Sequence, residues 1–80
     1  MAKRQVKLIF PQALIKEPVT YQMAKQYKVV FNIRRARVTE SVGEMVLELE
    51  GSDDDLAKAI TFFESKGVKV EPVTGDVVSP

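Results

Sequence analysis

The first apolar pattern in the chain repeats every two residues. Val6, Leu8 and Phe10 occupy alternate positions, and Pro11 ends the run. A period of two is typical of a strand that buries one face. The sequence therefore predicts a strand from about Val6 to Phe10, followed by a loop over residues 12–16.

A helical period comes next. Proline is favourable in the first turn of a helix, and Pro18 opens this segment. The apolar residues that follow are spaced four positions apart: Val19, Met23 and Tyr27. Because this spacing lines up side chains along one side of a helix, we expect a first helix from about Pro18 to Tyr27.

A second helical segment has its own start and stop signals. Ser52 with Asp55 three residues later matches a capping box, and the three carboxylates at 53–55 suit the positive end of a helix dipole. A calcium loop would spread its oxygen ligands along a turn with a glycine at the bend, so capping is favoured over a metal site. Lys66 and Gly67 are typical of a helix end. The apolar positions between these signals are expected in the core: Leu56, Ala59, Ile60 and Phe63.

Two strand-like segments follow the first helix, and one follows the second. Residues 29–38 are rich in β-branched and aromatic types, and residues 44–50 alternate glutamate with apolar side chains. The short polar segment 39–41 between them predicts a β-hairpin. Residues 68–73 predict a last short strand, and Pro72 indicates a sheet edge or a strand end because proline cannot donate to a ladder.

The predicted order of elements is therefore βαββαβ. Two helices on one face of a four-stranded antiparallel sheet form the ferredoxin-like arrangement, an α+β sandwich whose other sheet face is left open. Eighty residues are enough for one domain, which we expect over residues 1–73. Residues 74–80 lack periodicity and are interpreted as a tail or linker.

Composition narrows the functional classes. Twelve lysine and arginine residues against eleven acidic residues leave a net charge of +1, so no overall field favours nucleic acid or an anionic membrane. Cysteine and histidine are both absent, which removes thiolate and imidazole catalysis and the usual ligands of zinc and iron–sulfur clusters. We therefore expect no enzymatic activity, no metal and no cofactor in this chain.

Membrane signals are also absent from the sequence. No apolar run approaches the roughly 18–20 residues that span a bilayer, and the start Met1-Ala2-Lys3-Arg4 is not followed by the apolar region of a signal peptide. We expect a cytoplasmic protein without membrane insertion. A small core with one open sheet face gains by burying that face, which predicts a homodimer formed through sheet faces or edges.

Two other functions occur on the same topology. RNA-recognition domains stack bases on aromatic residues of their central strands, whereas residues 44–50 contain no aromatic residue. An acylphosphatase-like enzyme needs a phosphate-binding loop after the first strand, and residues 10–14 lack the glycines of such a loop. Glu44, Glu48 and Glu50 show no sign of burial in the sequence, so a solvated or interfacial face is favoured over acid–base chemistry.

Asn32 and a run of arginines stand out within the predicted hairpin. Asparagine is disfavoured in strands, so Asn32 either contacts a ligand or makes a hydrogen bond at a turn or edge. Strand alternation places Arg35 and Arg37 on one face and Arg34 on the other. These arginines either protect an edge strand from unwanted pairing or contact an anionic ligand or partner.

The same region resembles the NIL domain family. The resemblance is carried by Asn32-Ile33, the arginine-rich residues 34–38, the acidic and apolar segment 43–51, and the ending at 67–71. The family is named for an Asn-Ile-Leu triplet, and this chain carries Arg34 where the triplet has leucine. Members are known from the C-terminal ends of methionine-importing ABC transporter ATPase subunits and from segments fused ahead of iron–sulfur ferredoxin domains. Their fold is ferredoxin-like and related to ACT domains.

The resemblance implies a regulatory, non-catalytic function. In the transporter members the domain binds methionine at a dimer interface and holds the transporter inactive. By resemblance, this chain would bind methionine or a related sulfur-containing amino acid at such an interface and would have a transporter partner. The Asn32 amide would contact the charged groups of the ligand, and Phe31 and Ile33 would form apolar walls.

The ferredoxin-fused type of the family is the more similar one over residues 7–11, 17–19 and 29–33. This similarity implies a 4Fe-4S ferredoxin partner, fused or separate, whose cluster ligands lie outside this chain. The alternative function is therefore a docking or assembly module for a ferredoxin or a sulfur-metabolism protein. It would use the strand that carries the three arginines and the acidic strand over residues 44–50 instead of a pocket.

Overall fold

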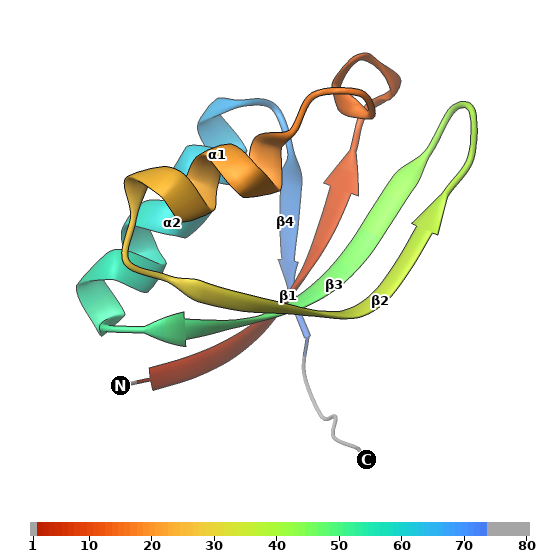
Figure 1. Cartoon of the computed structure of the whole chain (residues 1–80). Coiled ribbons are helices and arrows are strands. Elements are labelled where there is room, and N and C mark those ends of the chain that lie inside the picture. The colour runs from red at the N-terminus through yellow and green to blue at the C-terminus, as the bar shows by residue number, and fades with distance from the viewer. Residues whose placement is uncertain (1, 74–80) are drawn as a thin grey trace.

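A computed structural model describes residues 2–73 of the eighty-residue chain. The elements in chain order are β1 (Ala2–Phe10), a short 3₁₀ turn η1 (Gln12–Leu14) within the expected loop, α1 (Val19–Gln26), β2 (Val30–Val38), β3 (Gly43–Gly51), α2 (Asp53–Ser65) and β4 (Lys69–Pro72). The four strands form one antiparallel sheet in the order β2-β3-β1-β4, and both helices lie on one of its faces (Figure 1). The α+β ferredoxin-like fold is therefore confirmed, while the predicted tail at 74–80 lies outside the described residues.

The two central strands, β1 and β3, pair along their whole lengths. The alternation predicted for β1 is confirmed, since Val6, Leu8 and Phe10 are buried. The predicted start of β1 near Val6 was too late. β1 begins at Ala2, which lies opposite Gly51, because its first residues are held by backbone pairing with β3. Such pairing leaves no apolar signal in the sequence.

The ends of α2 are those that the sequence predicted. The hydroxyl of Ser52 accepts a hydrogen bond from the backbone N–H of Asp55 at 3.0 Å, which caps the helix. Gly67 follows the helix with φ of 98°, in the left-handed region that glycine adopts most readily. Asp54 forms an ion pair with Lys58 at 3.1 Å, and its hydrogen bond and charge raise the pKa of Lys58. Asp54 and Asp55 therefore interact with residues of the helix and its cap.

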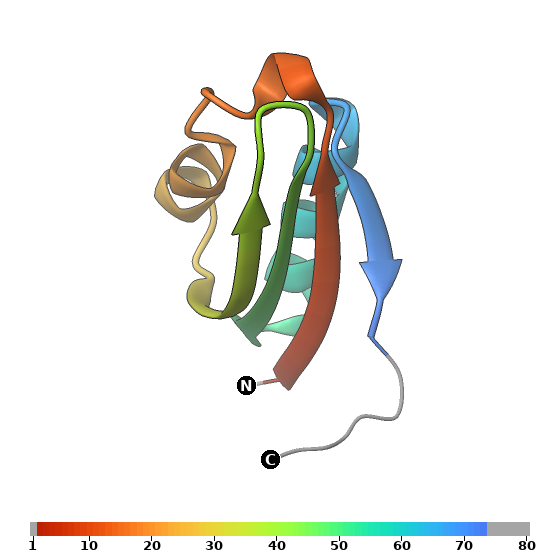
Figure 2. The same ribbon diagram turned by 90° about the vertical axis from the view of Figure 1, so that its right-hand side faces the viewer.

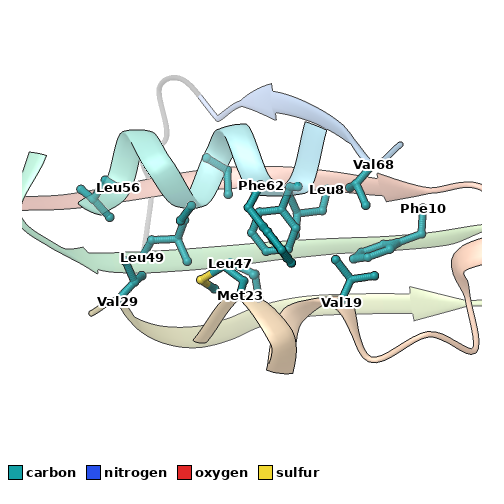
Figure 3. Packing of buried hydrophobic residues seen from close by; sticks show 13 residues of the cluster. Leu8, Phe10, Val19, Met23, Val29, Leu47, Leu49, Leu56, Phe62 and Val68 are labelled. Atoms are coloured by element: carbon teal, nitrogen blue, oxygen red, sulfur yellow. The ribbon is translucent and has the colours of Figure 1, made fainter. Parts of the chain in front are cut away.

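The core is a layer of side chains between the helices and the sheet (Figure 3). Leu56 and Phe63 of α2 are buried as predicted, whereas Ile60 is only partly buried. Phe62 is also buried, although helical spacing did not select it, because its ring packs edge-to-face against Tyr27 at 5.8 Å. The buried apolar residues are Val6, Leu8, Phe10, Val19, Met23, Val29, Leu47, Leu49, Leu56, Ala59, Phe62, Phe63 and Val68.

The first helix is short, with eight residues in α1 against thirteen in α2. Pro18 lies at its N-cap, Val19 and Met23 are buried, and Tyr27 is partly buried just beyond its end. Gln22 has a buried side-chain oxygen, Oε1, with no hydrogen-bond partner among the described residues. The helix packs chiefly against α2, and nearly all of β2 remains exposed.

The other face of the sheet carries no helix in the described part of the chain. Figure 2 looks onto this open face, with the four strands side by side and α2 behind them. Glu44, Glu48 and Glu50 of β3 project from it, because they alternate with Leu47 and Leu49 that are buried on the helix side. Within residues 2–73, neither helix is long and apolar enough to cross a membrane.

Candidate functional site

β2 is a long and exposed edge of the sheet. Among the described residues it pairs only with β3, and every residue of β2 except Phe31 is exposed. Three of the five exposed large apolar side chains in the described part of the chain belong to it: Val30, Ile33 and Val38. Exposed apolar side chains beside an unpaired strand edge are typical of an interaction surface.

The three residues that the resemblance assigns to a ligand lie side by side on β2 but on different faces. Phe31 is opposite Leu49 and Ile33 is opposite Leu47, and both leucines are buried on the helix side. Directly opposed residues project from the same face, so Phe31 and Ile33 are on the helix side as well. Asn32 is opposite a glutamate of β3 and therefore projects from the open face. Within one chain, the amide and the apolar side chains do not line a common pocket.

A β-bulge interrupts β2 just after this triplet. Ile33 pairs with Leu47 and Arg35 pairs with Val46, so Arg34 is an extra residue without a counterpart in β3. Val46 projects from the open face, and Arg35 therefore does so too. The bulge thus turns the second half of β2 relative to the first, as bulges commonly do.

The bulge gathers basic side chains around a hollow in the open face. Arg37 is opposite Glu44 and shares the open face with Arg35, as the sequence predicted for this pair. The hollow has a volume of about 200 Å³ and includes Lys7 of β1, which sequence reasoning did not select. We call it the basic hollow; its lining residues are Lys7, Arg35, Arg37, Glu44, Met45 and Val46.

A second depression lies at the hairpin end of the molecule, on the helix side. Its volume is about 220 Å³, and it opens between the η1 region, the start of α1 and the end of the β2–β3 hairpin. In Figure 1 this end of the hairpin extends away from the helices. We call it the apolar groove; it is lined by Phe10, Leu14, Ile15, Glu17, Pro18, Val19, Thr20, Tyr21, Val38, Gly43, Glu44 and Met45. Since its walls come from four separate segments, no single stretch of sequence predicts it.

The charged groups of the hairpin are not used by ion pairs within the described chain. The ion pairs formed among residues 2–73 are Lys58 with Asp54 at 3.1 Å, Lys66 with Glu17 at 3.8 Å, and Lys69 with Glu71 at 3.4 Å. None of them includes an arginine of β2 or a glutamate of β3. Nor do three acidic side chains gather as a metal site would, in the part of the chain that the structure describes.

The exposed groups of the hairpin are of kinds that bind ligands or other chains. The two strands of the hairpin present one amide, three guanidinium groups, three carboxylates and a row of apolar side chains, and the chain contains no histidine or cysteine. Guanidinium groups bind carboxylates and phosphates through paired hydrogen bonds, while an exposed strand edge offers backbone N–H and C=O groups to another strand.

Comparison with known protein families shows what this arrangement is similar to. The family model of the NIL domain matches residues 4–72, which includes all four strands and both helices except the first residues of β1. The match therefore spans nearly all of the described chain.

A similar curated protein is the methionine import ATP-binding protein MetN 2 of Acinetobacter baylyi. The two sequences are 40% identical over an alignment of 58 residues, and the match covers 68% of this chain. The chain covers only 17% of that relative, so it spans a small part of the relative's length.

A solved structure with the same fold is the C-terminal domain of an ABC transporter ATP-binding protein from Enterococcus faecalis. The TM-score is 0.77, and the alignment covers 91% of this chain and 86% of that one. At 19% sequence identity this similarity shows the fold alone.

Proposed function

Because the chain belongs to the NIL domain family, as the match over residues 4–72 shows, we propose that it is a non-catalytic regulatory domain that binds a small molecule. The proposed ligand is methionine or a related sulfur-containing amino acid, bound at a dimer interface. Support comes from the Acinetobacter relative, which is a methionine import ATP-binding protein. By the same relationship, the proposed partner is an ABC transporter ATPase in the cytoplasm.

One observation carries this proposal: the Asn32-Ile33 pair is exposed on a strand edge that no other strand of residues 2–73 covers. Asn32 is exposed on the open face, and Ile33 is 55% exposed on the other face. Buried core residues at these positions could not reach a ligand, whereas exposed ones can.

The division of the triplet between two faces supports a site shared by two chains. A ligand of amino-acid size that uses both an amide and an apolar wall cannot reach Asn32 and Ile33 around the edge of one strand. A second copy that approaches this edge supplies the missing group. Exposed Val30, Ile33 and Val38 give that contact an apolar surface to bury.

The proposal is tested by thermal unfolding with methionine, homocysteine, cysteine and S-adenosylmethionine. A ligand that binds only the folded protein stabilises it by about 2.7 kcal/mol at a hundredfold excess over its dissociation constant. We expect a concentration-dependent rise in Tm for one of these compounds. Asn32→Ala is expected to reduce that rise, because it removes the proposed amide contact.

Gln26→Ala provides the control, since it removes an exposed amide at the end of α1 instead. It should leave the ligand response unchanged. A flat response across millimolar concentrations of all four compounds would contradict the amino-acid ligand, and an unchanged response in Asn32→Ala would contradict the assigned position.

The alternative is a docking module for a ferredoxin or a sulfur-metabolism protein. The observation that favours it is the charge of β2, which contains Arg34, Arg35 and Arg37 and no acidic residue. This alternative expects no amino-acid binding but an acidic protein partner whose affinity falls as salt is added, since exposed charges are screened.

A further inference from the structure

Three basic side chains from two strands surround one residue of β3 on the open face. Val46 is opposite Arg35 of β2 on one side and opposite Lys7 of β1 on the other. Arg37 lies two residues further along β2, opposite Glu44. All of these residues line the basic hollow of about 200 Å³. An apolar floor is therefore flanked by cations on both sides.

The bulge in β2 is what brings the arginines there. Asn32 projects from the open face, so strict alternation would place Arg34 on that face and Arg35 and Arg37 on the helix side. The extra residue reverses this assignment, and Arg35 and Arg37 join Lys7. Bulges that re-aim side chains in this way are over-represented next to binding sites.

The charges around the hollow do not cancel. Among its lining residues, three side chains are cationic and only Glu44 is anionic. Glu71 is opposite Lys7 in the register, but its carboxylate pairs with Lys69 at 3.4 Å. No ion pair within residues 2–73 includes any of the three cations of the hollow. The hollow therefore has a net positive charge, which attracts an anion.

We propose that the basic hollow binds a multivalent oxyanion, of the kind found in a phosphoryl group or a dicarboxylate. Two guanidinium forks and an ammonium group supply the charge-assisted hydrogen bonds that such anions accept. The site lies beside Asn32 but needs no amino-acid ligand, so this inference stands independently of the proposed function.

The test is a titration of the ¹⁵N-labelled chain with inorganic phosphate and, separately, with succinate, at constant ionic strength. Saturable shifts are expected at the backbone amides of Lys7, Arg35, Arg37 and Val46 with either or both anions. Saturation by phosphate alone identifies a phosphoryl ligand, and saturation by succinate alone identifies a carboxylate ligand. Shifts that rise without saturation, or that spread equally over all lysines and arginines, overturn the proposal.

Two substitutions with opposite expected effects on anion affinity sharpen the test. Arg35→Gln should weaken binding about tenfold or more, the usual cost of one charge-assisted hydrogen bond. Glu44→Gln should tighten binding, because it removes the one carboxylate of the hollow. Arg37→Gln repeats the first test at a second position, in case Arg35→Gln alters the fold.

Lys3→Gln is the matched control. Lys3 is an exposed cation on the same sheet face, but it lies opposite Glu50 and outside the hollow. It should leave the affinity nearly unchanged. If Lys3→Gln weakens binding as much as Arg35→Gln does, the anion responds to overall charge and the proposed site is wrong.

Discussion

β2 and β3 are the two arms of one hairpin, yet their surroundings are opposite. β3 lies between two strands and beneath α2, and it buries Leu47 and Leu49 completely. Within residues 2–73, β2 has a neighbour on one side only, and its apolar residues other than Phe31 remain exposed even where they face the helix side. Ile33, for example, is 55% exposed, while Leu47 directly opposite is 0% exposed. The two arms of the hairpin therefore differ in packing: β3 is part of the core, and the side chains of β2 are accessible to solvent.

The largest difference between the two arms is expected when Leu47 of β3 and Ile33 of β2, which lie opposite each other, are substituted separately and the free energy of unfolding is compared. Leu47→Ala leaves a cavity in the core and should lower the free energy of unfolding by about 2–5 kcal/mol. Ile33→Thr keeps a β-branched side chain on the exposed partner and, at protein concentrations too low for the proposed dimer to form, should change the free energy of unfolding by no more than about 0.5 kcal/mol. Urea unfolding followed by circular dichroism measures both. Equal losses in the two variants would refute the division between the arms.

Alanine substitutions at the two ends of β3 are expected to differ in stability by an intermediate amount. A Cβ atom at Gly51 would lie 2.9 Å from the backbone oxygen of Lys28, just before β2 begins. Backbone cannot move aside cheaply, so Gly51→Ala should cost about 1–3 kcal/mol of unfolding free energy. At Gly43 the closest atom is Phe10 Cβ at 3.4 Å, and Gly43→Ala should cost less. If the two alanine variants have the same Tm, the close approach at the Gly51 end is not a constraint.

The smallest effect is expected at the loops that flank β3. Ser52 caps α2 through the backbone N–H of Asp55, and Ser52→Ala should cost about 1 kcal/mol. Ser41 lies in the exposed turn between β2 and β3, and Ser41→Ala should be close to neutral because no helix depends on it. Thermal unfolding of the two variants tests this ranking, and a larger loss for Ser41→Ala would reverse it.

Local signals account for most of the predicted elements. The alternation of Val6, Leu8 and Phe10 and the capping box at Ser52 each depend on a few neighbouring residues, and both are confirmed. The start of β1 and the burial of Phe62 were not predicted, because they depend on contacts with β3 and with Tyr27.

In the candidate sites, too, neighbouring residues set some features and contacts between distant segments set the others. Arg35 and Arg37 share a face, as their spacing predicts, but the bulge at Arg34 decides which face it is. Lys7 was not selected because nothing near it in the sequence distinguishes it from other lysines of the chain. It joins the arginines only because β3 holds β1 and β2 at a fixed register. The apolar groove was missed for the same reason, since its walls are distant in sequence.

By itself, the sequence determined the order of elements, the ferredoxin-like fold and the family resemblance, because periodicity, caps and turn residues act over a few neighbouring positions. Only the tertiary structure decided which strand is covered and which is exposed, because that depends on where α1 and α2 pack over the sheet. It also decided that Asn32 projects from the open face and Ile33 from the helix side, and it gathered Lys7, Arg35 and Arg37 at one hollow, since strand register is a relation between segments that are far apart in the chain.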